Sequence, residues 1–347
     1  MTSPTPARPR TNLRLTAIVL LWLPAAVLAE CAPGRLNLRL DNDLLSGLGR
    51  DGGYTNGFQL VSVSPALRDD GDAGFLPWPA GALNRYLGWL QPDGDERYAQ
   101  AGVGLALFTP TEHEATGLQP ADRPYAAVLL AGVGYTARSG DHLRSAQLRI
   151  GMVGPSVRGG QLQNAVHTLT GSEKWRGWAN QLQDEPVFQL LYERLRRWSG
   201  PSSADGLGTD VIAHWGGSLG SFQTYANAGF EWRIGRNLPA DFGSDPMRPA
   251  ARSDGGLRRT ARDGTTDVHL FASVDLRAVA RNITLDGNTW RESARVDKRG
   301  FVVDSGIGVS VVGSDWTLTF ARYIRSREFA GQKDRPVFGS LALSYAL

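Results

Sequence analysis

Two groups of polar residues have the types and spacing needed to hydrolyse an ester. The first lies in the segment "NAVHTLTGSE" at 164–173, where His167 stands six residues before Glu173. Gln163 and His167 are four positions apart, so they share one face of a helix. We expect that helix from about 160 to 170, on the helical spacing of Leu162, Ala165, Val166 and Leu169. Gly171 would end the helix and let Glu173 turn back towards the histidine.

The second group lies earlier in the chain, in the segments "RLDND" and "YTNG", which supply Asn42, Asp43 and Thr55. Two carboxylates, those of Asp43 and Glu173, together with amide and backbone oxygens are hard ligands suited to Ca²⁺. A neutral histidine beside them could deprotonate a water, while the cation stabilises the oxyanion of an attacked ester. The alternative is a set of solvated polar loop residues without chemistry. From the residues alone both interpretations stay open.

The N-terminus predicts export. Arg8, Arg10 and Arg14 precede an apolar run over 15–28, which closes on the small-residue site Val27-Leu28-Ala29. We therefore expect a signal peptide over 1–29 and a mature chain over 30–347. The single cysteine, Cys31, excludes an intrachain disulfide.

The mature sequence reads as a sheet protein, because apolar and polar residues alternate in twelve segments spread along its length. The last segment places a regular apolar face at Val337, Gly339, Leu341, Leu343, Tyr345 and Leu347. A soluble sandwich is one solution. An exported chain with an even number of strands fits an all-β, 12-stranded antiparallel transmembrane β-barrel better, with the short helix in an extracellular loop.

Barrel topology brings the two polar groups together. With both termini in the periplasm, the connections 43–53 and 154–185 emerge at the same extracellular rim, and a tight turn there is expected near Gly216-Gly217. Two connections at the opposite end, 65–97 and 236–265, are unusually long. The first contains "LNRYLGWL", which predicts a short amphipathic helix at the inner membrane interface. The second has no explanation in the sequence.

Three other features of the sequence are weaker evidence of function. "GGSLG" at 216–220 matches the nucleophile elbow, but an alternating strand follows it, so Ser218 is interpreted as a hairpin residue. His113, between Glu112 and Glu114, is either a weak metal ligand or a solvated loop residue. The net charge of +3 is too small to indicate nucleic-acid binding.

With these residues in place, the sequence resembles the LpxR-type lipid A deacylases. The resemblance rests on "DND", "YTNG", "DRPYAAVLLAG", "EPVFQLLYER", "ARNITLDGN" and, most specifically, "GMVGPSVRGGQLQNAVHTLTGSEKWRGWANQL". It implies a twelve-stranded outer-membrane barrel with the active site between wall and loop helix. It also implies a calcium-dependent ester hydrolase that removes the 3′-linked acyloxyacyl group from lipid A of lipopolysaccharide in the outer leaflet. We expect such an enzyme to act as a monomer among outer-membrane lipids.

Site residues follow from the resemblance position by position. His167 would activate water, with Gln163 one turn before it. Asn42 and Thr55 would orient the substrate, and Asp43 and Glu173 would bind Ca²⁺ as the oxyanion site.

One departure affects the substrate. A lysine that part of the family has in the second outer loop is missing here, where "EHE" at 112–114 stands instead. Arg123 or Lys174 is then a candidate for contact with a lipid A phosphate. Trp175 and Trp178 are candidates for anchoring the loop helix at the membrane interface. The alternatives to a deacylase are a non-catalytic barrel, as a pore or lipid transporter, and a related outer-membrane phospholipase.

Overall fold

The computed structural model describes residues 34–42, 45, 53–67, 86–170, 172–203, 206–243 and 266–347. The signal peptide expected over 1–29, Cys31 and the candidate ligand Asp43 therefore lie outside the described residues. Within these ranges no helix combines the length and the apolar character needed to cross a bilayer.

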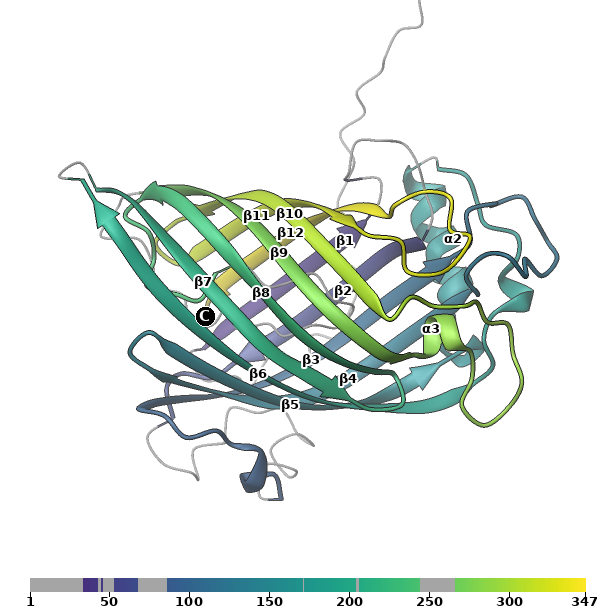
Figure 1. Cartoon of the computed structure of the whole chain (residues 1–347), viewed down its shortest axis with the longest axis horizontal. Helices are drawn as coiled ribbons and strands as arrows, with labels where there is room; N and C mark the ends of the chain where they lie inside the picture. The colour runs from purple at the N-terminus through teal and green to yellow at the C-terminus, as the bar shows by residue number, and fades with distance from the viewer. Residues whose placement is uncertain are drawn as a thin grey trace, which may run out of the picture.

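The alternating segments form a closed antiparallel barrel, in which each strand pairs with its neighbours in sequence and β1 pairs with β12 (Figure 1). The described strands are β1 (Arg35–Asn42), β2 (Gly53–Val63), β3 (Glu96–Thr109), β4 (Ala126–Ser139), β5 (His142–Val153), β6 (Glu185–Ser202), β7 (Leu207–Leu219), β8 (Gln223–Arg236), β9 (Asp267–Asn282), β10 (Phe301–Val312), β11 (Trp316–Arg325) and β12 (Val337–Ala346). The predicted fold class is confirmed. We call the end that carries the helices α2 (Gly159–Thr170) and α3 (Ile283–Asp286) the helix end, and the opposite one the terminal end.

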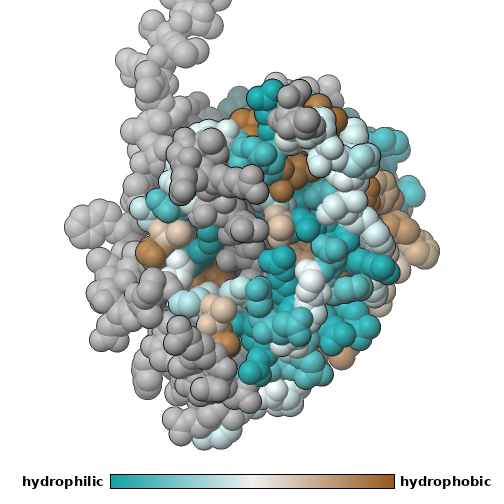
Figure 2. Space-filling model, turned by 90° about the vertical axis from the view of Figure 1, so that its left-hand side faces the viewer, coloured by the Kyte–Doolittle hydropathy of each residue, from teal (hydrophilic) through white to brown (hydrophobic). Residues whose placement is uncertain are grey.

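Alternation along each strand separates lumen from outer wall. In β6, Gln189 and Glu193 are buried in the lumen, whereas Phe188 and Tyr192 are exposed on the outside. An apolar outer face suits lipid, and closure of the sheet satisfies the backbone groups that lipid cannot. Figure 2 views the terminal end, where hydrophilic residues gather over the middle of the described surface and hydrophobic ones lie along its right-hand margin.

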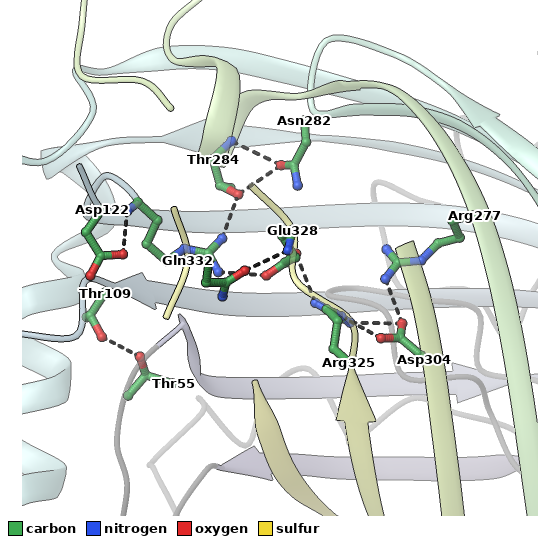
Figure 3. Close-up of polar contacts among 11 residues, drawn as sticks. Thr55, Thr109, Asp122, Arg277, Asn282, Thr284, Asp304, Arg325, Glu328 and Gln332 are labelled. Carbon is green, nitrogen blue, oxygen red and sulfur yellow. Dashed lines mark hydrogen bonds and ion pairs between the residues drawn. The ribbon is translucent and has the colours of Figure 1, made fainter. Parts of the chain in front are cut away.

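Side chains fill the lumen. Arg325 Nε donates to Asp304 Oδ1 at 2.6 Å, and Arg277 Nη2 donates to the other oxygen of Asp304 at 2.6 Å (Figure 3). A cavity of only about 20 Å³ lies between residues that include Gln59 and Gln100. Twelve strands make a narrow barrel that side chains can fill, so the lumen offers a poor path for solutes.

Loops close the helix end of the lumen. Leu182, Phe222 and Ile283 pack into the lumenal core from three different connections. Beside them Arg123 donates to Glu328 Oε2 and to Thr284 Oγ1, both at 3.1 Å.

The start of the long segment 236–265 enters the lumen at the terminal end. Residues 237–243 fold back into the barrel, where Asp241 pairs with the buried Arg233. Phe242 packs in a cluster with the lumenal residues Leu143, Leu195 and Ile212. Filling the lumen accounts for the first part of a segment that the sequence left unexplained; 244–265 lies outside the described residues.

Two local predictions need correction. The turn expected near Gly216-Gly217 is wrong, because both glycines lie in β7 and the connection to β8 is at 220–222. The helix expected in "LNRYLGWL" is reduced, in its described part, to the 3₁₀ turn η4 (Gly88–Leu90). Leu90 packs there on the outer wall, while Trp89 is 67 % exposed.

Ser218 is a strand residue. Its hydroxyl donates to the backbone oxygen of Gln223 at 2.8 Å, and strand β8 follows. The strand-turn-helix context of a nucleophile elbow does not occur at this position, so the interpretation of "GGSLG" as part of a hairpin is confirmed.

Candidate active site between the loop helix and the barrel wall

Helix α2 lies against the outside of the barrel at the helix end (Figure 1). The wall residues Leu107 and Ala127 point outward and pack with Trp175 and Trp178 of the same connection. Gly159 begins the helix at this contact, and a Cβ there would stand 2.3 Å from the Ala127 Cβ. Glycine is therefore required for the helix to approach the wall this closely.

The helix turns its polar face to the wall. Gln163 and His167 have exposed fractions of 0 % and 1 %, so the shared face expected from their spacing is confirmed. Ala165 is exposed and Val166 half-buried on the other side. Gln161 and Thr168 are also exposed, so the outer face of the helix is mixed in polarity. Apolar packing does not account for the buried polar stripe of Gln163 and His167, which makes it a candidate site.

His167 is held in one tautomer by its own connection. Its Nδ1 hydrogen-bonds the backbone oxygen of Glu173. A carbonyl can only accept, so Nδ1 carries the proton and Nε2 keeps the lone pair in the neutral ring. Trp175 contacts the imidazole edge-on, with ring centroids 5.4 Å apart. The arrangement suits a general base with Nε2 as its basic atom.

Gln163 is oriented by an indole. Trp178 Nε1 donates to Gln163 Oε1 at 2.7 Å. An indole nitrogen only donates, which identifies the amide oxygen and leaves Nε2 as the second polar atom. Nε2 is buried and has no hydrogen-bond partner among the described residues. A buried, unpaired donor usually has a functional explanation, and here it can bind a substrate oxygen.

Thr55 joins this region through a β-bulge. The register of β2 against β3 shifts between Tyr54 and Asn56, and such a bulge re-aims side chains. Tyr54 donates to Asp41 in the lumen at 2.9 Å, whereas Thr55 Oγ1 lies 2.6 Å from Thr109 Oγ1 (Figure 3).

The contact of Thr55 with Thr109 continues to the loop helix. Trp175 Nε1 donates to the backbone oxygen of Pro110, next to Thr109, at 3.0 Å. Because Trp175 also packs against the imidazole, consecutive contacts connect Thr55 with His167.

Asn42 occupies the neighbouring strand. Its Nδ2 donates to Asn56 Oδ1 at 2.5 Å, between β1 and β2. The two strands adjoin β3 in the barrel order, so Asn42 lies on the side of the barrel that α2 covers.

Of the two expected calcium ligands, the structure describes Glu173 but not Asp43. The Glu173 carboxylate is 77 % exposed and lies 2.8 Å from His113 Nε2, so its backbone oxygen, not its side chain, contacts His167. No group of three or more His, Cys, Asp or Glu able to hold a metal occurs in the described part of the chain, which omits Asp43. The carboxylate, amide and hydroxyl oxygens of Glu173, Asn42 and Thr55 fit a hard cation chemically.

Two expectations about loop residues are wrong. Trp175 and Trp178 are 3 % and 8 % exposed, so they fix the helix to the wall instead of anchoring it in the membrane interface. Arg123 is 1 % exposed and bonded to Glu328, so it is not available to a substrate phosphate. Burial also raises the pKa of Tyr125, which packs on Trp178, to about 12, so this hydroxyl stays protonated.

The comparison with family models decides the relationship. The model described as outer membrane protein LpxR matches residues 15–347. The chain belongs to the LpxR family. Membership places it in the outer membrane, among the lipid A deacylases that the sequence resembles.

Two solved structures are similar to the chain to different degrees. LpxR from Salmonella typhimurium is similar with a TM-score of 0.71 and 18 % identity, over 90 % of this chain and 100 % of that one. The beta domain of the Bordetella autotransporter BrkA reaches a TM-score of 0.45 at 11 % identity, over 91 % and 100 % of the two chains. No curated protein matches the sequence. The LpxR likeness supports the barrel; the roles of the individual residues remain predictions.

Proposed function

We propose that this LpxR-family barrel is a calcium-dependent ester hydrolase that removes the 3′-linked acyloxyacyl group from lipid A in the outer leaflet. One observation carries the chemical part of the proposal. His167 donates from Nδ1 to the Glu173 backbone oxygen, which leaves Nε2 as a base inside a buried site on the outer wall. The family assignment supports the substrate class.

One side chain, that of His167, takes up and returns the proton in the proposed reaction. His167 Nε2 takes a proton from a water molecule, and the water oxygen forms a bond to the ester carbonyl carbon. When the tetrahedral intermediate collapses, the bond to the sugar oxygen breaks, and the imidazolium returns its proton to that oxygen. The products are a free carboxylic acid and a sugar hydroxyl.

Neighbouring side chains orient the substrate. Gln163 Nε2 is the donor turned away from Trp178, and it can bond the ester carbonyl. Asn42 and Thr55 supply an amide and a hydroxyl from the adjoining wall. Asp43 and Glu173 are the residues that would hold the calcium ion, whose charge would stabilise the oxyanion.

The position of the site suits a lipid. Its polar residues lie on the outer wall, so an acyl chain can reach them without leaving the bilayer. We expect the enzyme to act as a monomer. The filled lumen weighs against the non-catalytic pore, which needs an open path.

The test is mass spectrometry of lipid A after incubation with the purified barrel in detergent, with Ca²⁺ or with a chelator. We expect loss of an acyloxyacyl mass in wild-type protein with Ca²⁺ only, and none with His167→Ala. Phospholipid supplied in the same micelles should stay intact; its cleavage instead of lipid A would favour the phospholipase. Cleavage that survives His167→Ala would remove this site from the mechanism.

A further inference from the structure

A groove of about 950 Å³ opens beside the candidate active site. It is lined by Arg158, Gln161, Asn164, Lys174, Trp175 and Arg176, among others. Gln163 and His167 are not among its lining residues, whereas Glu173, a proposed calcium ligand, is one of them. Its polar lining at the membrane surface raises the question of which ligand it takes.

The charge of the groove favours an anion. Arg158, Lys174 and Arg176 are all exposed, so each guanidinium or ammonium is accessible from solvent. Two carboxylates, those of Glu114 and Glu173, also border the groove; that of Glu173 lies 2.8 Å from His113 Nε2, and the three cations outnumber the two carboxylates. Guanidinium groups bind phosphate oxygens bidentately and ammonium groups bind them as point charges.

The backbone at Arg158 is a second, independent observation. This residue has φ 59°, in the left-handed region that glycine or asparagine adopts at lower cost. Its amide donates to the Pro155 oxygen at 2.9 Å, at the entry to α2. The Arg158 side chain is exposed, so it gains no burial in return for this backbone conformation.

Two tryptophans connect the groove with the wall site. Trp175 lines the groove and packs on His167, and Trp178 lines it and bonds Gln163. A headgroup in the groove would therefore sit one indole away from the proposed base. That arrangement would fix which ester of a large glycolipid comes to His167.

We propose that Arg158, Lys174 and Arg176 form a subsite for a phosphate group on the sugar headgroup of the lipid substrate. The proposal rests on the proposed function for the identity of the lipid, and it deepens it by naming the feature of the headgroup that is recognised. It also distinguishes these exposed cations from Arg123, which is buried against Glu328.

Binding tests the subsite apart from turnover. The barrel is prepared in detergent with His167→Ala, and its Kd is measured by calorimetry for bisphosphorylated lipid A and for the same lipid without phosphates. Adding Arg158→Gln and Arg176→Gln should weaken binding of the phosphorylated lipid about tenfold, equivalent to about 1.4 kcal/mol. Binding of the dephosphorylated lipid should change less than twofold.

The matched control is Arg291→Gln with Arg335→Gln, two exposed arginines on other connections of the helix end, and it should leave both Kd values unchanged. Equal losses for both lipids, or no loss, would overturn the proposal. A third arm titrates inorganic phosphate alone; a loss confined to that ion would overturn the assignment to a lipid headgroup. Because nothing is hydrolysed, failure of the deacylase proposal would be seen only in the mass spectra, and failure of the subsite only here.

Discussion

Polar side chains are buried on both sides of the barrel wall, but they are paired in different ways. In the lumen, cations meet carboxylates: Arg233 bonds both oxygens of Asp210, at 2.8 and 2.5 Å, and pairs with Asp241. Under α2, the polar side chains are held by uncharged partners. Gln163 is fixed by an indole and His167 by a backbone oxygen, and each keeps one atom for another partner.

This difference in pairing indicates that the lumenal residues serve stability, whereas those under α2 are candidates for catalysis. A buried ion pair whose members satisfy each other has little left to offer a ligand, and removing one member strands a charge. A buried amide with an unpaired donor contributes less to stability than it could, which is expected where substrate completes the set. Burial alone does not identify the site; the identity of each partner does.

The largest expected effect is on activity. His167→Gln removes the base but keeps a polar side chain of similar size, so deacylation should fall by about 10²–10⁴-fold. The melting temperature should stay within a few degrees, because the only described hydrogen bond of the ring is to a loop carbonyl. His142→Gln, at an exposed histidine on β5, is the matched control. A large loss of stability in His167→Gln would mean that this histidine, like the lumenal ion pairs, stabilises the fold, and would contradict the distinction between the two regions.

The opposite pattern is expected in the lumen. Arg233→Ala removes the cation that Asp210 and Asp241 share and leaves their buried negative charge uncompensated by it, so it should lower the free energy of unfolding by about 3–5 kcal/mol. Urea unfolding in detergent measures this, and turnover of the folded fraction should remain within twofold of wild type. Arg236→Ala, on the same strand but exposed, should cost under about 0.5 kcal/mol. Loss of turnover with unchanged stability in Arg233→Ala would contradict the structural role.

A smaller effect is expected where an indole positions the amide. Trp178→Phe keeps an aromatic ring against the wall but removes the N–H that orients Gln163. One hydrogen bond is worth about 0.5–1.5 kcal/mol, so kcat should fall by up to about tenfold with KM little changed. Trp290→Phe, at an indole that is 77 % exposed, is the control. An unchanged kcat would show that Gln163 needs no such support.

Much of this distinction was accessible from the sequence. Alternation predicted the strands because each strand contacts lipid on one side and a filled lumen on the other, a pattern that repeats every two residues. The helix over 160–170 and the common face of Gln163 and His167 followed from the 3.6-residue period, and both are confirmed.

The features that the sequence did not predict depend on contacts between segments that have no periodic pattern. Trp178 packs on the wall residues Leu107 and Ala127 and donates a hydrogen bond to Gln163, fifteen residues earlier in the chain. Arg123 is buried because Glu328, 205 residues away, accepts its hydrogen bond. Residues 237–243 are held at the lumen by contacts that include the ion pair of Asp241 with Arg233 and the packing of Phe242. Long-range pairs of this kind have no local signature, so the loop tryptophans and Arg123 were misassigned.

The smallest expected effect concerns pH at the helix end of the lumen. Burial alone would raise the pKa of Glu328, but Arg123, Arg325 and Arg277 outweigh it and hold that pKa below its usual value of 4.5. A depressed folded pKa adds stability above pH 4.5, and this part is lost as pH falls through the folded value.

Glu328→Gln should therefore be less stable than wild type at neutral pH, and the difference should shrink as the pH is lowered below 4.5. Urea unfolding across that range measures it, with Glu292→Gln at an exposed loop glutamate as the control. The stability difference at neutral pH should be smaller than that of Arg233→Ala, since Arg123 and Arg325 both keep a hydroxyl or a carboxylate partner, Thr284 and Asp304 respectively. A stability difference between Glu328→Gln and wild type that stays constant with pH would mean that Glu328 acts through its shape and not through its charge. Ion pairs in the lumen would then contribute less to stability than their geometry indicates.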